Sequence, residues 1–359
     1  MYDKIINFEN LYKAYRKVRL LKRHYPSQQK YEFNLETNLC KLHLRLRDPQ
    51  KYKPKQYRKF TIYEPKMREI SAPHFEDRII HQAIVRIIEP DIIQTYIPAS
   101  YACIKGRGTH KVVKDLGSAL KKLGDKGTFY FKADMRRYFA SVDHAVLKRF
   151  LRQYLHCEKT LILLDKIVDS YEDEPNKGIP IGNLTSQLFA NLYLSELDHF
   201  VDSPSYFRYM DDFVILAKDK DELIRLRDEI NNFLQSTLKL KLHPRKQLIQ
   251  RISFGIEFCG YNIYTNKAIL RKKTLRRFVH RFKRKQKRIG KLQREIDSYL
   301  SPEFDQELAD KIVELKEELD RSVVSHLGFL KYSEIDTAKK DYGYVNKIRL
   351  PYLPKKCDR

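Results

Sequence analysis

The chain opens with apolar residues at helical spacing. Leu11, Ala14 and Val18 follow one another at intervals of three or four, with lysines and arginines between them, and this spacing predicts an amphipathic helix. Pro49 and Pro54 interrupt the pattern, because proline lacks a backbone donor and disfavours helix in the residue before it. We therefore expect a helical region from residue 1 to about residue 50.

Strand and helix patterns then alternate between residues 57 and 264. Short apolar runs bounded by turn residues predict strands, and a 3.6-residue period predicts the helices between them. This alternation is typical of an α+β domain with a mostly antiparallel sheet. From residue 271 onward the chain becomes long, charged and helical, so we place a domain boundary near residue 267. The predicted strands are residues 60–63, 68–71, 128–134, 206–209, 213–217, 247–252 and 255–264, and the predicted helices are 75–88, a segment ending near 124, 144–155, 159–171, the stretch through 188–197, and 220–236.

The composition of the chain predicts a polyanionic binding partner. With 359 residues, of which 42% are hydrophobic, the chain can bury the cores of two or three subdomains. Its net charge of +25 is spread along the sequence, which favours nucleic acid as the partner. No apolar run approaches the length of a membrane span and no signal peptide is recognisable. The five cysteines form no C-x-x-C pair, so we expect reduced thiols in a soluble, cytoplasmic protein that does not bind a membrane.

Acidic residues stand at two strand ends. Asp134 closes one apolar run, and the pair Asp211-Asp212 lies between two others, at the predicted tip of a hairpin. If these strands are neighbours, the three carboxylates converge into a cup that suits two Mg²⁺ ions, with Mn²⁺ as a possible substitute. Two such ions about 3.5–4 Å apart serve nucleotidyl transfer. A solvated hairpin turn is the ordinary alternative for an Asp-Asp pair.

Tyr209-Met210-Asp211-Asp212 resembles the signature of reverse transcriptases, and other motifs of that family occur in the same order. The likeness covers about residues 57–264, with a weaker match to the thumb at residues 325–330. The further matching segments are residues 68–70 and 77–82 (fingers region), 101–110 (the next loop), 134–139 (first catalytic motif), 178–187 (template-and-nucleotide loop) and 258–261 (primer grip).

The resemblance implies an α+β right-hand polymerase. A helical N-terminal extension would occupy residues 1–56. Fingers would comprise residues 57–127 and 144–182, the palm residues 128–143 and 183–266, and a helical thumb residues 267–359. The implied activity is RNA-directed DNA polymerisation, in which a template RNA is copied into cDNA from dNTPs and an RNA/DNA hybrid is formed.

Site residues follow from the same resemblance. Each assignment has an ordinary alternative: a core aromatic for Phe139, and a solvated surface cation for Arg68, Lys246 and the thumb arginines. The implied metal ligands are Asp134, Met135, Asp211 and Asp212, of which the three aspartates are catalytic; the nucleotide-binding residues are Arg68, Phe139, Ile181, Gly182, Gln187 and Lys246; the primer grip is Phe258, Cys259, Gly260 and Tyr261; and the cations facing the duplex backbone are Arg276, Arg277, Arg281 and Arg284.

The template-and-nucleotide loop departs from the common pattern. Most relatives carry Gln-Gly and Ser-Pro where this chain has Ile181-Gly182 and Ser186-Gln187. The aliphatic residue resembles the reverse transcriptases of diversity-generating retroelements, bacterial or phage-encoded enzymes that misread template adenines and use a small basic helical accessory protein. Ile181 as a mere packing residue is the alternative.

Other functions stay open on the sequence. They are a group II intron-like, retron or phage-defence reverse transcriptase, and an inactive RNA-binding scaffold. Because the chain ends soon after the predicted thumb, we expect no maturase, endonuclease or ribonuclease H domain.

Overall fold

The computed structural model describes residues 1–20, 26–63, 66–298 and 306–331, and the chain divides into two compact units. The first unit comprises residues 1–108 and 129–250, and the second comprises residues 109–128 and the chain from 251 onward. This division places residues 109–128 in the second unit. The C-terminal part of that unit begins at residue 251, before the predicted boundary near 267. The fingers, palm and thumb limits therefore stay predictions.

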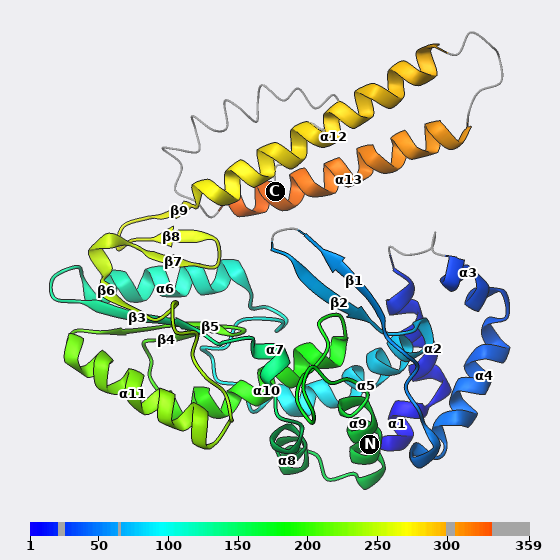
Figure 1. Cartoon of the computed structure of the whole chain (residues 1–359), viewed down its shortest axis with the longest axis horizontal. Helices are drawn as coiled ribbons and strands as arrows, with labels where there is room; N and C mark the ends of the chain where they lie inside the picture. Colours follow the sequence, from blue (N-terminus) through cyan, green and yellow to red (C-terminus); the bar gives the residue numbers. More distant parts are fainter. Residues whose placement is uncertain (21–25, 64–65, 299–305, 332–359) are drawn as a thin grey trace. The chain divides into compact units, whose positions relative to one another are not determined.

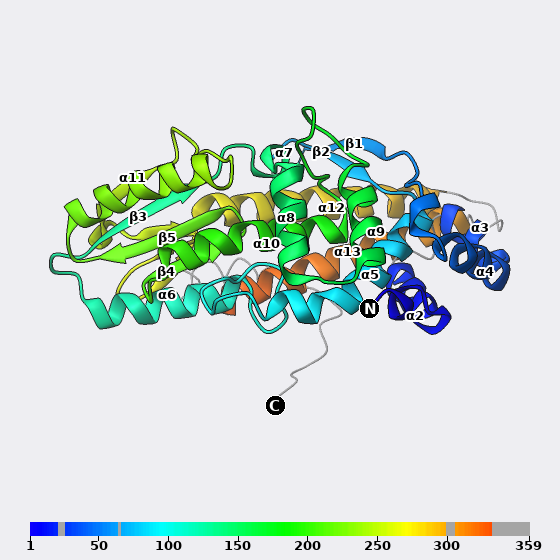
Figure 2. The same cartoon turned by 90° about the horizontal axis from the view of Figure 1, so that it is seen from below.

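The centre of the first unit is a sheet with strand order β4-β5-β3-β6. β5 (Asp212–Ala217) pairs antiparallel with both β3 (Phe129–Asp134) and β4 (Tyr206–Tyr209), and β6 (Leu248–Arg251) lies beyond β3. Four consecutive residues of β5, from Phe213 to Leu216, are buried. Helix α11 (Lys220–Ser236) packs against β3 and β5, as Figures 1 and 2 show. The structure confirms the predicted α+β class and its antiparallel sheet.

The first unit also contains the β1–β2 hairpin and further helices. β1 (Arg58–Ile62) and β2 (Arg68–Ala72) pair antiparallel, as the sequence predicts. The described residues of the N-terminal region, 1–20 and 26–51, are mostly helical and form several short segments. The helices are α1 (Tyr2–Ile6), α2 (Phe8–Arg19), α3 (Pro26–Phe33), α4 (Leu35–Leu46), the 3₁₀ turn η1 (Pro49–Lys51), α5 (Phe75–Ile93), α7 (Tyr138–Ser141), α8 (His144–Tyr154), α9 (Glu158–Val168) and α10 (Leu184–Val201).

Helix α5 fixes the N-terminal helices in place. The Asn10 side chain of α2 donates to the carbonyl oxygen of Ala83 in α5 at 3.1 Å. Buried Asp77, also in α5, accepts hydrogen bonds from the Tyr52 hydroxyl at 2.8 Å and from the Lys55 backbone at 2.9 Å. These bonds satisfy a carboxylate that burial would otherwise destabilise.

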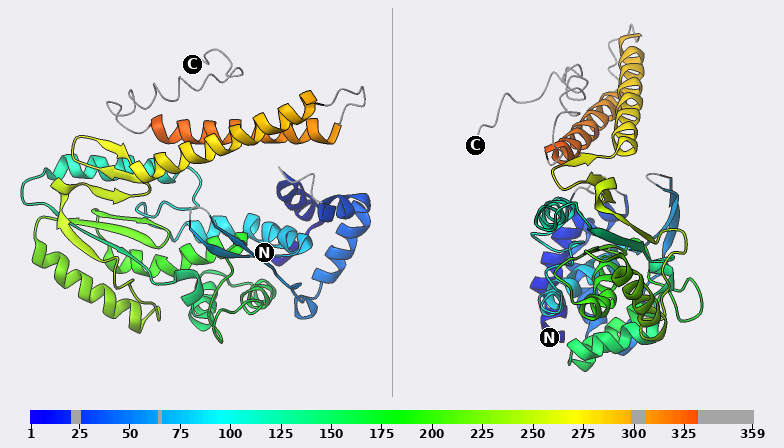
Figure 3. Two further views of the ribbon diagram at one scale, coloured as in Figure 1. Left: turned by 45° about the horizontal axis from the view of Figure 1, so that its top comes forward. Right: turned by 90° about the vertical axis from the view of Figure 1, so that its left-hand side faces the viewer.

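The second unit holds helix α6 (Thr109–Leu123), a three-stranded sheet and two long helices. The sheet contains β7 (Ile256–Phe258), β8 (Tyr261–Ile263) and β9 (Ala268–Leu270). Helices α12 (Lys272–Ser298) and α13 (Gln306–Lys331) form a helical hairpin, seen in Figure 3. Its small core contains Phe278 and Phe282 of α12 with Leu319 and Val323 of α13.

One strand prediction in this unit is wrong, and one strand was not predicted. Residues 255–264 form two strands and not one, because Cys259 (φ 48°) and Gly260 (φ 88°) turn the chain between Phe258 and Tyr261. Two positive φ values at a two-residue connection produce a tight hairpin. Strand β9 was not predicted, because three residues are too short for a periodic signal. Within the residues that the structure describes, no helix is long and apolar enough to cross a membrane.

Candidate active site

Strand pairing brings the acidic residues to one end of the sheet. Asp134 at the end of β3 is the cross-strand partner of Asp212 at the start of β5. The amide of Met135 donates to the carbonyl oxygen of Asp211 at 3.2 Å. The predicted neighbourhood of the two strands is thereby confirmed.

A strained turn presents Asp211. β4 and β5 are joined by Met210 and Asp211, and Met210 has φ 58°. A non-glycine residue in this left-handed region costs on the order of 1–3 kcal/mol and persists only where surrounding contacts hold it. The turn therefore depends on its neighbours for its shape.

The carboxylates repel one another in a partly desolvated site. Burial, and then the adjacent Asp134 carboxylate with which it hydrogen-bonds, raises the pKa of Asp211. Burial raises the pKa of Asp212 to about 7, although Lys132 opposes the shift. The Lys132 ammonium lies 3.5 Å from Asp212. One carboxylate next to another favours protonation unless a cation is present.

Lys246 reaches the same site from a loop. The segment after α11 runs beside the end of β3, where the backbone amide of Arg136 donates to the Lys241 carbonyl at 2.9 Å and the backbone amide of His243 donates to the Asp134 carbonyl at 2.8 Å. A turn then brings the Lys246 ammonium into an ion pair with the Asp134 carboxylate. The structure thus places this predicted nucleotide-binding cation at the acidic cluster.

The donor set suits a divalent cation in part. Asp134 and Asp211 are in contact, and the buried Oδ1 of Asp212 has no hydrogen-bond partner among the described residues. However, no three His, Cys, Asp or Glu side chains in the described part of the chain are arranged so that they could hold one ion together. The structure therefore brings the three predicted carboxylates to one end of the sheet, with Asp134 and Asp211 in contact and Asp212 beside Lys132.

The template-and-nucleotide loop is anchored to two elements. The backbone amide of Ser71 in β2 donates to the carbonyl oxygen of Ile181 at 3.0 Å, and the backbone amide of Ile179 donates to the carbonyl oxygen of Phe139 at 2.8 Å. Gly182 has φ 139°, and a Cβ there would lie 2.8 Å from the Ser71 carbonyl oxygen. Only glycine permits this approach without strain.

The remaining nucleotide-binding candidates are more dispersed. Phe139 is half-buried, with its ring edge-on to that of Tyr138. Arg68, at the start of β2, and Gln187, in the first turn of α10, are both exposed. Phe139 is thus hydrogen-bonded to the loop that carries Ile181 and Gly182, whereas Lys246 contacts the carboxylate of Asp134.

The sequence matches the family model described as reverse transcriptase (RNA-dependent DNA polymerase) over residues 53–263. The chain belongs to the reverse transcriptase family. The family assignment, with the mixed helices and antiparallel sheets, confirms the predicted right-hand polymerase fold.

Individual relatives are distant. Protein YkfC of Escherichia coli K12 is 23% identical over 254 residues, which cover 58% of this chain and 67% of YkfC. The group II intron-encoded protein LtrA of Lactococcus lactis subsp. cremoris is 22% identical over 292 residues, or 60% of this chain. The match spans about half of LtrA, 48% of its length. Among solved structures, apo telomerase from Candida tropicalis has a TM-score of 0.47 at 13% identity, covering 80% of this chain and 61% of that one.

The segment predicted as the primer grip, residues 258–261, lies at the turn between β7 and β8. The rings of Phe258 and Tyr261 are buried, so they pack within the second unit. Cys259 and Gly260 form the turn, and the backbone amide of Arg271 donates to the Gly260 carbonyl at 3.0 Å. The primer-grip assignment therefore stays a prediction.

Helix α12 carries the predicted duplex-binding arginines. Arg276, Arg281 and Arg284 are exposed and Arg277 is half-buried. Arg277, Arg281 and Arg284 recur at intervals of four and three, which places them on one helix face. Glu318 of helix α13 forms an ion pair at 2.8 Å with Lys285 of α12, which is not one of the four predicted arginines. The thumb-like match at residues 325–330 lies almost entirely outside the residues whose side chains are described.

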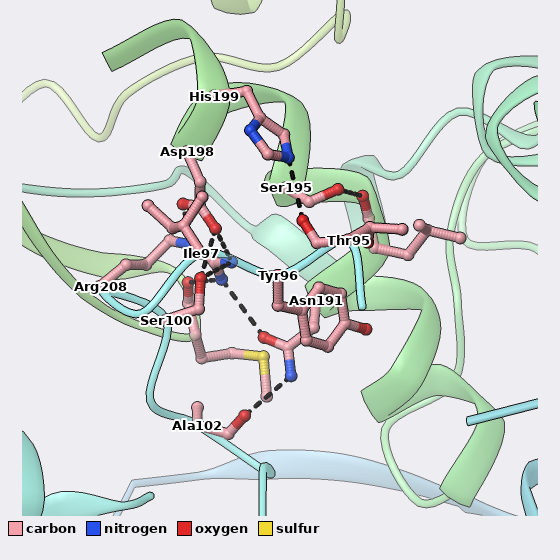
Figure 4. A network of polar contacts seen from close by, with 12 residues as sticks. Thr95, Tyr96, Ile97, Ser100, Ala102, Asn191, Ser195, Asp198, His199 and Arg208 are labelled. Carbon is pink, nitrogen blue, oxygen red and sulfur yellow. Dashed lines mark hydrogen bonds and ion pairs between the residues drawn. The ribbon is translucent and has the colours of Figure 1, made fainter. Parts of the chain in front are cut away.

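One residue beside the signature motif escaped the sequence analysis. Arg208, immediately before Tyr209, is only 1% exposed and forms a two-bond ion pair with fully buried Asp198. Figure 4 shows Asp198, Ser100 and Asn191 gathered around its guanidinium group. An arginine inside an otherwise apolar strand is the signal that could have identified it, because charged residues are almost never fully buried unless they are paired.

Proposed function

We propose that this chain is an RNA-directed DNA polymerase that copies a template RNA into cDNA by nucleotidyl transfer to a primer 3′-hydroxyl. The observation that carries the proposal is the contact between Asp134 and Asp211 at the end of the sheet, in a chain of the reverse transcriptase family. Adjacent carboxylates resist ionising together unless cations compensate their charge, and a bound divalent ion would supply such charge beside Lys246. A primer-extension assay on an RNA template tests this function directly.

Asp134, Asp211 and Asp212 are the proposed ligands of two Mg²⁺ ions, with Mn²⁺ as a possible substitute. Met135 can add only its backbone carbonyl, because its side chain is buried. Bound divalent ions would lower the pKa of the attacking hydroxyl and neutralise charge on the leaving pyrophosphate. The orphaned Oδ1 of Asp212 supports this assignment, since a buried carboxylate oxygen without a donor is unfavourable.

The chain's own side chains would position the substrates. Lys246 carries a positive charge to the edge of the acidic cluster, where it can meet the pyrophosphate oxygens. Phe139 is proposed to contact the sugar of the incoming dNTP. Arg68 and Gln187 are proposed to bind the same nucleotide. The basic face of α12 is proposed to hold the backbone of the RNA/DNA hybrid, since phosphate contacts position a duplex without reading its sequence.

The proposed subtype is an error-prone reverse transcriptase of a diversity-generating retroelement. Its support is Ile181, which offers no polar atom where most relatives have Gln, next to a glycine packed against β2. A missing hydrogen bond to the incoming nucleotide would remove roughly 0.5–1.5 kcal/mol of positioning, up to about tenfold in discrimination. The choice of template adenine rests on the family resemblance. A small basic helical protein is the proposed partner.

A group II intron-like polymerase is the second candidate, because LtrA is a group II intron-encoded protein. Sequencing of cDNA made by the wild type, Ile181→Gln and Ile181→Leu on one template separates the two. We expect frequent errors opposite adenine in the wild type, fewer in Ile181→Gln, and no change in Ile181→Leu, which stays apolar. Uniformly low error in the wild type would leave the polymerase intact and exclude the diversity-generating subtype.

A further inference from the structure

The Arg208 guanidinium is saturated with hydrogen bonds. Nε donates to Asp198 Oδ1 at 2.6 Å, and Nη2 donates to Asp198 Oδ2 at 2.5 Å and to Ser100 Oγ at 3.1 Å. Nη1 donates to Asn191 Oδ1 at 3.3 Å and to the Met210 carbonyl oxygen at 3.0 Å. An arginine has five N–H donors, so every donor has a partner.

Asp198 is equally occupied. Besides Arg208, its carboxylate accepts from the Ser100 hydroxyl at 2.5 Å and the Tyr206 hydroxyl at 2.8 Å. Asn191 is fixed in turn, because its amide donates to the Ala102 carbonyl at 2.8 Å. The cluster therefore joins helix α10, strand β4 and the loop after α5, as Figure 4 shows for the labelled residues.

One bond of this cluster leads to the catalytic turn. The Met210 carbonyl belongs to the residue held at φ 58°, and Asp211 follows directly. Strained backbone persists only where its surroundings hold it, and this charge-assisted bond is a contact that does so. Charge-assisted bonds are roughly twice as strong as neutral ones.

We propose that Arg208 is a positioning residue that sets the conformation of the Met210-Asp211 turn and thereby places the Asp211 carboxylate. The inference rests on the proposed polymerase function. Arg208 does more than hold β4 in the fold. The ion pair with Asp198 fixes the guanidinium, and the guanidinium fixes the turn through the Met210 carbonyl. Lysine cannot replace it, because three donors on a flexible stem cannot span Asp198, Asn191 and Met210 together.

The first test is Arg208→Lys, with Tyr52→Phe as its control. Tyr52→Phe removes a different buried hydrogen bond to an aspartate, the one from the Tyr52 hydroxyl to Asp77 at 2.8 Å, and leaves the Met210-Asp211 turn untouched. We expect Arg208→Lys to lower kcat by about 10²-fold, since a misplacement of 1 Å can have that effect. Affinity for Mn²⁺, measured by electron paramagnetic resonance on the folded protein, should fall by about 10-fold or more. Template–primer affinity should not change.

A gentler pair of variants decides the matter if Arg208→Lys does not fold. Ser100→Ala removes one partner of both Arg208 and Asp198, whereas Ser195→Ala removes a buried hydroxyl of α10 that donates at 2.7 Å to Leu192. Both serines are fully buried. We expect Ser100→Ala to lower kcat and Mn²⁺ affinity in the same direction as Arg208→Lys, and Ser195→Ala to affect stability alone.

Equal kcat and equal Mn²⁺ affinity in the wild type and every folded variant, measured below their unfolding temperatures, would overturn the positioning role. Failure of the wild type to extend any primer would instead contradict the proposed function. In that case the Mn²⁺ titrations still decide whether Arg208 controls the turn.

Discussion

Gly182→Ala tests how the template-and-nucleotide loop is held, and Gly108→Ala is its matched control. The two glycines have similar φ values, 139° and 131°. A Cβ at Gly182 would lie 2.8 Å from the Ser71 carbonyl oxygen and 3.3 Å from Ile70, whereas a Cβ at Gly108 would meet nothing within 4 Å. Both substitutions strain the backbone, but only the first separates the loop from β2.

The difference in the free energy of unfolding between the two variants measures the cost of separating the loop from β2. Backbone strain costs each about 1–3 kcal/mol, and forced overpacking adds roughly 1–3 kcal/mol at Gly182. The hydrogen bond from Ser71 to Ile181 contributes about 1 kcal/mol more if it is lost. We therefore expect Gly182→Ala to be less stable than Gly108→Ala by roughly 1–4 kcal/mol.

Urea unfolding measures this difference, and both glycines belong to the first unit, so one transition reports on both. Steady-state kinetics supply the functional arm: the KM for dNTP should rise about tenfold in Gly182→Ala, as expected for a loss of about 1.4 kcal/mol in binding. Equal stability of the two variants, or an unchanged KM in Gly182→Ala, would refute the role of this contact.

Three further predictions concern nucleic acid, pH and initiation. Replacing Arg277, Arg281 and Arg284 by Gln should reduce the slope of log affinity against log salt by about 0.7–0.9 per lost phosphate contact; an unchanged slope contradicts a duplex-facing helix. Because burial raises the pKa of Asp212 from 3.8 to about 7 and raises the pKa of Asp211 as well, the folded state binds more protons, and metal-free stability should fall as pH rises through that interval. In thermal unfolding with EDTA, Asp212→Asn should reduce this fall, and a fall as large as that of the wild type contradicts the prediction. The isolated chain should extend simple primers but initiate poorly on its own RNA, and efficient specific initiation would favour a retron-like enzyme.

Local sequence patterns predicted most elements of the first unit because its strands and helices are long enough to show a period. The apolar run at residues 213–217 predicted a strand, and β5 is that strand, with Phe213 to Leu216 all buried. The N-terminal helix prediction was correct in type, but the breaks at Asn7, between α1 and α2, and at Asn34, between α3 and α4, were not foreseen. In the second unit, β9 has three residues and left no periodic signal.

The site could be predicted only where one segment carries its own signal. Asp211 and Asp212 lie in a recognisable motif at a hairpin tip. The contact of Lys246 with Asp134 depends on a loop beside β3, and residues 112 positions apart show no pattern in the sequence. The role of Asp198 was equally hidden, because its partners lie on a helix, a strand and a loop whose approach is a property of the fold.

Primer extension on an RNA template with a DNA primer, dNTPs and Mg²⁺ tests the central claim most directly. The wild type should extend the primer, and Asp134→Asn or Asp211→Asn should reduce extension by at least about 10²–10³-fold, because each variant removes charge stabilisation of the transition state. Template–primer binding should persist in both, and Asp228→Asn on the exposed surface of α11 should remain fully active. Extension by Asp211→Asn at the wild-type rate would contradict the assignment of the catalytic carboxylates.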